Sequence, residues 1–266
     1  MKHDVCLIGA VTKDINRVGN QVTEMAGGAA FYVAETLTSL GLTVKVVTNE
    51  GMVFENIYTD SDHRTQNALS QSEPIHFDQV KDIQAQVFYF GPLIHDDIDL
   101  DVYAKLSEQS DFIVLDAQGL TRKVENKTVV KQHSPHTAEI LKYVNLLKVD
   151  VEEALILSEE KDLVEAAKKL CRMGPEEIVI TRGSKGSLVF ASNRFYEFSS
   201  VRAQKIVDPT GCGDTFMAAY LYQRKNAASF EKAANFAAEI AAKKIAKIGP
   251  WCADIFHNNN NMLKLS

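Results

Sequence analysis

Short apolar runs alternate along the chain with amphipathic and alanine-rich segments, and this pattern predicts its elements. An apolar run that closes with glycine predicts a first strand over residues 1–9. Two extended runs within residues 14–25 flank Gly19-Asn20, a dipeptide that favours a tight hairpin turn. Small residues predict a helix over residues 29–40, which ends at Gly41.

The rest of the chain continues this alternation. Strands are predicted at residues 44–47, 87–90, 112–115, 146–149, 178–181, 187–190 and 195–198, and extended chain at 54–66. Helices are predicted at residues 101–108, 137–143, 151–173 (one or two helices), 215–224 and 230–247. Strands that alternate with helices indicate a largely parallel sheet covered by helices on both faces.

Several charged residues come directly after predicted strands. Ligands of such sheets lie at the carboxyl ends of the strands. We therefore expect one edge of the sheet to gather Asp14, Asp116, Asp150, Arg182 and Asp208. The pattern predicts a single domain over residues 1–256 and a polar, poorly ordered tail over residues 257–266.

Composition and charge exclude several classes of protein. The 266 residues suffice for one large α/β domain with a buried core. A formal net charge of −6 without a long basic run argues against nucleic-acid binding. No apolar stretch approaches the roughly 20 residues that span a bilayer, so no membrane partner is expected. The four cysteines are far apart and the seven histidines form no ligand pattern, which argues against disulfides and zinc and favours a cytoplasmic location.

The most informative stretch is Asp208-Pro209-Thr210-Gly211-Cys212-Gly213-Asp214. It follows the apolar pair Ile206-Val207, interpreted as a strand end, and precedes the predicted helix at 215–224. Such a turn leaves unpaired N–H groups at a helix N-terminus, where they bind anions. Asp214 stands where the anion would sit. This makes sense if its carboxylate takes a proton from a hydroxyl that attacks phosphorus, while the amides stabilise the transferred group.

Two other interpretations stay open for this stretch taken alone. An Asp at a helix N-terminus is often only a cap, worth about 1 kcal/mol. A dinucleotide-binding fingerprint would need a third glycine, and Phe216 occupies that place. The fixed turn entry at Pro209, the hydroxyl of Thr210 and the second carboxylate at Asp208 favour phosphoryl transfer.

The stretch resembles the signature D-T-x-G-A-G-D of the ribokinase-like (pfkB-type) carbohydrate kinases. Pro209 after the first acid and Cys212 in place of the usual alanine are the departures. The resemblance implies a ribokinase-like three-layer α/β/α sandwich with a mostly parallel sheet and a small β lid. This lid would be short and formed around residues 15–25 and 53–66.

The resemblance also implies the activity, an ATP-dependent phosphorylation of a hydroxyl on a small sugar, polyol or nucleoside. Asp214 would be the catalytic base, and Gly211, Cys212 and Gly213 would form the anion hole. On the nucleotide side, the resemblance implies roles for Gly183, Lys185, Gly186, Asp208, Thr210, Asn235 and Ala238. Taken alone, the Gly-Ser-Lys-Gly stretch within that set is more often a hairpin turn with a solvated lysine.

Asp150 and Glu153 resemble the family's N-x-x-E motif, which is tied to magnesium and phosphate, with Asp in place of Asn. The resemblance thus implies Mg²⁺ as a cofactor and leaves a requirement for K⁺ open. Magnesium usually keeps several waters, so these acids would act partly through water. The other interpretation of the pair is a capping box at the start of a helix.

On the substrate side, the resemblance implies contacts from Asp14, Gly27, Gly28, Tyr32, Asn56, Arg64, Gln118 and Arg122. Tyr32 replaces the family's usual Asn, which should change the hydroxyls that are recognised. Arginine forks suit anionic groups, although a surface arginine is the other interpretation of Arg64 and Arg122. A Gly-Gly pair before a helix is also often only a turn.

The predicted lid is shorter than in most members of the family. A partner subunit, in a homodimer, is one way to complete it. The short lid and Asp150 motivate an alternative function, a non-catalytic sugar- or nucleotide-binding regulator on the same fold. The intact Gly-Cys-Gly-Asp favours the kinase, because a protein that only binds has no need of a base. A Rossmann oxidoreductase lacks its fingerprint here.

Overall fold

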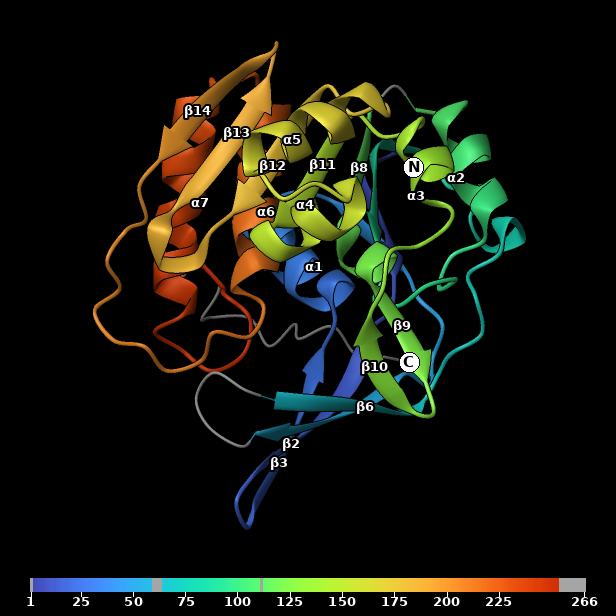
Figure 1. Cartoon of the computed structure of the whole chain (residues 1–266), viewed down its shortest axis with the longest axis vertical. Coiled ribbons are helices and arrows are strands. Elements are labelled where there is room, and N and C mark those ends of the chain that lie inside the picture. Colours follow the sequence, from blue (N-terminus) through green and yellow to red (C-terminus); the bar gives the residue numbers. More distant parts are fainter. Residues whose placement is uncertain (1, 59–63, 111, 254–266) are drawn as a thin grey trace.

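The computed structural model of the chain describes residues 2–58, 64–110 and 112–253. Within them, a central sheet of eight strands has the spatial order β14-β13-β12-β11-β8-β7-β1-β4 (Figure 1). In that order the strands span Arg194–Phe198, Ser187–Ala191, Glu177–Thr181, Leu146–Asp150, Ile113–Asp116, Ala85–Gly91, His3–Gly9 and Val44–Val47. The strands from β12 to β4 pair in parallel, and only β13 and β14 run antiparallel to their neighbours. The predicted mostly parallel sheet is confirmed.

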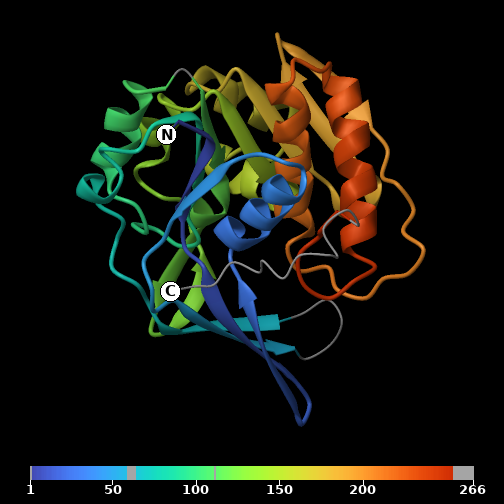
Figure 2. The same ribbon diagram turned by 180° about the vertical axis from the view of Figure 1, so that it is seen from behind.

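Helices cover both faces of this sheet, because alternate residues of each buried strand point to opposite sides. In β1, Val5 and Leu7 join one apolar cluster, and Cys6 and Ile8 join the other. The first face carries α1 (Ala29–Ser39), α6 (Cys212–Lys225) and α7 (Phe230–Lys244), which lie in front in Figure 2. The second face carries α2 (Leu100–Ser107), α3 (Thr137–Leu141), α4 (Val151–Ser158) and α5 (Leu163–Arg172). The three-layer α/β/α sandwich is confirmed.

A second sheet of the described residues forms the lid, in the order β3-β2-β5-β6-β10-β9. Its strands span Gln21–Gly27, Thr12–Val18, Val53–Tyr58, Arg64–Ser70, Thr128–Lys131 and Arg122–Glu125. The hairpin of β9 and β10 was not predicted. Its strands are short and polar, and its turn uses Asn126 and Lys127 at positive φ (49° and 69°) without a glycine. This hairpin makes the lid larger than the sequence suggested.

One predicted strand end is wrong. Ile206 and Val207 lie in the long connection after β14, and both are exposed. β14 is already the edge of the central sheet, so no strand is available to pair with them; Val207 instead donates its N–H to the Ile245 carbonyl at the end of α7. Asp208 therefore follows a loop, and Asp14 lies within lid strand β2 rather than just after a strand of the central sheet.

Smaller differences concern boundaries and coverage. The segment at 151–173 forms two helices, α4 and α5, and α6 begins at Cys212, so that the Gly213-Asp214 pair lies in its first turn. Short 3-10 turns cover Phe77–Gln79, Ala117–Thr121 and Gly183–Lys185. The predicted tail at 257–266 and part of the extended segment at 54–66 lie outside the described residues. Among the described helices, none combines the length and the apolar character needed to cross a membrane.

Candidate active site

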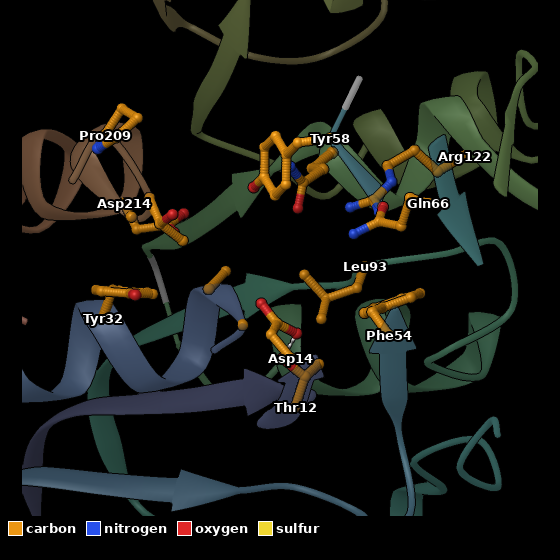
Figure 3. A pocket seen from close by; sticks show the side chains of 15 residues that line it. Thr12, Asp14, Tyr32, Phe54, Tyr58, Gln66, Leu93, Arg122, Pro209 and Asp214 are labelled. Carbon is orange, nitrogen blue, oxygen red and sulfur yellow. Dashed lines mark hydrogen bonds between the residues drawn. The ribbon is translucent and has the colours of Figure 1, made fainter. Parts of the chain in front are cut away.

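A cavity of about 390 Å³ lies between the lid and the central domain. Its walls are formed by Thr12, Asp14, Gly28, Ala29, Tyr32, Phe54, Tyr58, Gln66, Leu93, Gln118, Arg122, Pro209, Thr210, Gly211 and Asp214. Figure 3 shows Asp214, Pro209 and Tyr32 at one end. Gln66 and Arg122 lie at the opposite end, with Asp14 between the two groups (Figure 3). The structure thus joins the signature stretch to the lid in one cavity.

The first turn of α6 forms one end of this cavity. Gly211 is its N-cap residue and adopts φ 72°, a conformation that favours glycine. A Cβ atom there would also come within 2.3 Å of the Tyr32 ring. Cys212 follows in the turn, and burial raises the pKa of its thiol to about 11, which keeps it protonated. The Cys212 N–H donates to the Pro209 carbonyl (3.2 Å). A helix N-terminus generally leaves N–H groups without intrahelical partners, a geometry suited to an anion.

Asp208 holds the entry to this turn. Its carboxylate accepts hydrogen bonds from the Thr210 N–H (2.9 Å), the Lys244 ammonium (2.9 Å) and the Gly249 N–H (3.2 Å). Burial works to raise the pKa of this carboxyl, but the bonds from Lys244 and Thr210 outweigh it and keep the pKa below its ordinary value. Asp208 is therefore an anion that shapes the loop, and it does not line the cavity.

Behind Asp214 lies a cluster of buried charges. Lys148 on β11 places its Nζ 3.1 and 3.0 Å from the two carboxylate oxygens of Asp116 and 4.0 Å from Oε2 of Glu153. A Cβ atom on Gly213 would lie 3.6 Å from the same Nζ, so the lysine sits directly beneath the first turn of α6. Sequence reasoning missed Lys148. The available signal was a lysine inside the apolar run of a buried parallel strand.

The cluster changes the protonation of its acids. Burial raises the pKa of Asp214 above its ordinary value; Lys148 opposes this and Glu153 adds to it. Burial also raises the pKa of Asp116 to about 6 and of Glu153 to about 7, again against Lys148. Burial alone would lower the pKa of Lys148, but the surrounding carboxylates outweigh burial and hold the pKa above its usual range. Burial thus makes the Asp214 carboxylate more basic than one in solvent.

The predicted substrate residues divide into those on the cavity wall and those behind it. Asp14, Gly28, Tyr32, Gln118 and Arg122 line the cavity. Gly27 and Asn56 do not. A Cβ atom on Gly27 would lie 2.4 Å from Oδ2 of Asp14, so this glycine makes room for the carboxylate. Arg64 begins β6, and its side chain lies outside the described part of the chain.

Asn56 supports the cavity from behind. Its side-chain oxygen accepts a hydrogen bond from Gln66 Nε2 (2.8 Å), and its amide donates to Asn16 (2.9 Å). Gln66 in turn accepts a hydrogen bond from Arg122, whose guanidinium lies 5.4 Å from the Phe54 ring. Gln66 and Phe54 were not singled out as contacts, although both lie in the predicted lid segment at residues 53–66; the structure brings both to Arg122.

Asp150 and Glu153 form the capping box that the alternative interpretation predicted. Asp150 Oδ1 accepts from the Glu153 N–H (2.8 Å), and Glu153 Oε2 accepts from the Asp150 N–H (2.7 Å). Within residues 2–58, 64–110 and 112–253, no group of three or more His, Cys, Asp or Glu side chains is placed to hold a metal ion. A magnesium ion here would therefore depend on water and donor phosphates for most of its ligands.

Among the candidate nucleotide residues, Thr210 lines the cavity and the others do not. Gly183 and Lys185 belong to an exposed 3-10 turn after β12, and Gly186 follows at φ 87°. A Cβ atom on Gly186 would lie 2.0 Å from the Phe198 carbonyl oxygen, which explains the glycine by close packing. On α7, Asn235 is exposed and Ala238 is buried. None of these residues lines the cavity that holds Asp14 and Asp214.

Comparison with known proteins agrees with this fold. The sequence model of the pfkB family carbohydrate kinases matches residues 56–252. A cytidine kinase of Thermococcus kodakarensis is 29% identical over 93% of this chain and 98% of its own length. A pyrophosphate-dependent kinase in the ribokinase family, complexed with a pyrophosphate analogue and myo-inositol, superposes with a TM-score of 0.83 at 28% identity, over 92% of this chain and 96% of its own.

A more distant structure shares the fold alone. Ribokinase of Arabidopsis thaliana, complexed with ribose and ATP, is 17% identical and superposes with a TM-score of 0.72 over 94% of this chain and 95% of its own. The family match extends over most of the chain, and the ribokinase-type fold and the signature at the start of α6 agree with it. The chain belongs to the pfkB family of carbohydrate kinases.

Proposed function

We propose that this kinase transfers the γ-phosphoryl group of ATP to a hydroxyl of a small polyhydroxylated acceptor, a sugar, polyol or nucleoside. The observation that supports this most is that Asp14 and Asp214 line one cavity together with Gly211. A carboxylate on the lid can accept hydrogen bonds from acceptor hydroxyls, while the other stands at a helix N-terminus suited to anions. One cavity thereby joins acceptor recognition to phosphoryl binding.

Asp214 is the general base in this mechanism. Its carboxylate takes the proton of the acceptor hydroxyl as that oxygen forms a bond to the γ-phosphorus. The bond from this phosphorus to the β–γ bridging oxygen breaks, and ADP leaves with the electron pair. Burial raises the pKa of Asp214 toward the working pH, where a base is most effective. The N–H groups at the start of α6 stabilise the charge on the phosphoryl oxygens.

At this end of the cavity the buried carboxylates around Lys148 outnumber it, and a magnesium ion would balance their excess negative charge. Asp116, Glu153 and Asp214 surround a single buried lysine. Mg²⁺ usually binds through one or two carboxylates, several waters and substrate phosphates. Glu153 and Asp150 would hold it through water, and the ion would neutralise charge on the donor phosphates. The chain's own residues still do the positioning and the proton transfer.

The remaining donor contacts follow from the family resemblance. Gly183, Lys185 and Gly186 would meet the nucleotide phosphates, and Asn235 and Ala238 would border the adenine. An ATP-dependent reaction and four free cysteines also support a cytoplasmic location.

The cavity wall away from Asp214 supports an acceptor rich in hydroxyl groups. Gln118 and the linked pair of Gln66 and Arg122 offer amide and guanidinium groups to such an acceptor. Phe54 and Leu93 add an apolar surface for the face of a ring. The kinase complexed with myo-inositol supports a cyclic polyol, and the cytidine kinase supports a nucleoside.

A second candidate concerns the donor. Two structures of pyrophosphate-dependent kinase in the ribokinase family, one of them a sulfate complex, superpose with TM-scores of 0.83 and 0.84 at 28% and 29% identity, above the 0.72 of the ribokinase complexed with ATP. Pyrophosphate would use the same helix N-terminus and would need no contact from Asn235 or Ala238. Substitution of Asn235 would then leave turnover unchanged.

The test is product formation with ATP or pyrophosphate across a panel of sugars, cyclic polyols and nucleosides, all with Mg²⁺. We expect turnover with one acceptor class and a loss of at least about 10³-fold in the Asp214→Asn variant. Asp78→Asn, at an exposed surface ion pair, is the matched control and should keep full activity. Binding of donor and acceptor without turnover on any combination would refute the kinase proposal and favour the regulator.

A further inference from the structure

Lys244 is a buried lysine beside the active site that the mechanism does not use. It is the last residue of α7 and has no exposed surface. Its ammonium donates to the Asp208 backbone carbonyl (2.9 Å) and to Asp208 Oδ2 (2.9 Å). Lysine is almost never fully buried unless it is paired, so this position needs a specific reason.

The ammonium lies behind the loop that forms the anion site. The chain after α7 also contacts Asp208. The Ile245 carbonyl accepts hydrogen bonds from the N–H groups of Val207 and Asp208, and the Gly249 N–H donates to the Asp208 carboxylate. The Lys244 Nζ also lies 5.5 Å from the centre of the Tyr32 ring, which packs against Gly211. Lys244 thus contacts the start of the loop directly and its end through Tyr32.

Stability alone is a weak reason for such a pair. A buried ion pair can often be replaced by apolar side chains of similar volume without loss of stability, because desolvation of both charges offsets their attraction. What an apolar residue could not supply is a fixed positive charge next to an anion-binding turn. Charge placed in advance in a dry site is effective at stabilising phosphoryl transfer.

We propose that Lys244 is a built-in monovalent cation of this active site. Its ammonium holds the Asp208–Gly213 loop in the form that binds the transferred phosphoryl group, and it makes turnover independent of added K⁺. An ammonium group and K⁺ are of similar size and both bind carbonyl and carboxylate oxygens. A free ion at this place would need the two Asp208 oxygens that Lys244 already occupies. This role as a positioning residue rests on the proposed function.

The first test uses the wild-type enzyme. Initial rates are measured at constant ionic strength with tetramethylammonium, Na⁺, K⁺ or NH₄⁺ as the only monovalent cation. We expect indistinguishable kcat values in all four. A severalfold activation by K⁺ over tetramethylammonium would overturn the proposal, and this comparison needs no variant that might misfold.

The second test compares two variants at the same position. Lys244→Ala removes the charge and leaves a space, whereas Lys244→Met removes the charge and fills it. We expect kcat to fall by about 10²-fold in both, with little change in the acceptor KM. K⁺ or NH₄⁺ should restore much of the rate in Lys244→Ala and none in Lys244→Met. Lys243→Met, on the exposed side of the same helix, is the control and should behave as wild type.

A kcat of Lys244→Met equal to that of the wild type would refute the proposal. So would a folded Lys244→Ala variant that no cation restores, because the lysine would then act only through its packing. Thermal unfolding of each variant establishes that it is folded before its rate is interpreted.

A third readout needs no turnover and so separates this proposal from the proposed function. Thallium(I), which substitutes for K⁺ and scatters X-rays anomalously, is soaked into crystals of the wild type and of Lys244→Ala. We expect a thallium peak beside Asp208 in the variant and none there in the wild type. A peak at that place in the wild type, or its absence from the variant, would overturn the proposal even if no acceptor were ever found.

Discussion

Replacement of Lys148 by methionine should destabilise the protein strongly at high pH and much less at low pH. The Lys148 ammonium lies 3.0 Å from an Asp116 oxygen, and both side chains are nearly inaccessible to solvent. At an effective dielectric constant of about 20, such a pair attracts by about 5 kcal/mol. Measured losses on removing one partner of a buried pair are about 3–5 kcal/mol. We therefore expect the free energy of unfolding to fall by about 4 kcal/mol near pH 8.

The pH dependence follows from the carboxyls that Lys148 balances. Burial raises the pKa of Asp116 to about 6 and that of Glu153 to about 7, above their values in the unfolded chain. Between the unfolded and folded pKa values the folded state binds more protons, so its stability falls as pH rises through about 4 to 7. Once these carboxyls are protonated they no longer need the lysine. The loss in Lys148→Met should therefore shrink near pH 5.5.

The assay is urea unfolding of wild type and Lys148→Met near pH 8 and near pH 5.5. Lys168→Met is the control, because Lys168 forms only an exposed pair with Glu165 and should cost no more than about 0.5 kcal/mol at either pH. Addition of Asp116→Asn to Lys148→Met should recover part of the loss. An equal loss at both pH values, or a loss no greater than in the control, would refute this electrostatic account.

Two further substitutions test the turn at the start of α6 and the ion pair at the start of β12. Gly211→Ala should lower kcat by about 10²-fold in steady-state kinetics, because its Cβ would meet the Tyr32 ring. Gly41→Ala is the control: Gly41 also has a positive φ, but a Cβ there would lie in open space, so kcat should not change. Arg224→Met should lower the free energy of unfolding in urea by about 3 kcal/mol, because it leaves Glu177 buried without its ion pair. The acceptor KM should stay the same, and a changed KM would contradict this purely structural role.

The pattern of the chain predicts the central domain well, because parallel strands are buried on both faces and so appear as continuous apolar runs. The strands predicted at 87–90, 112–115 and 146–149 became β7, β8 and β11. The same rule misplaced Ile206 and Val207, an apolar pair that the fold leaves exposed. A sequence pattern reports which side chains could be buried, whereas actual burial also needs a neighbouring strand.

The lid was harder to predict because its strands depend on partners far along the chain. β10 pairs with β6 through Thr128 and Asn67, and its own residues are too polar and too few to predict a strand. The consequence extends to the site. Arg122 was identified from its local motif, and Gln66 lay in the predicted lid segment, but the hydrogen bond between them appears only once β6 and β9 are placed in one sheet.

In the proposed mechanism, the two lysines that sequence reasoning overlooked let one end of the cavity both attract phosphate and keep a base. Each pairs with a carboxylate other than Asp214: Lys148 with Asp116 and Lys244 with Asp208. Within the described residues, neither lysine forms an ion pair with Asp214. A direct pair would lower the pKa of Asp214 and weaken it as a base. Lysines that pair with a neighbouring carboxylate instead still favour the binding of an anion. The raised pKa of Asp214, caused by its burial, is consistent with this division of charge.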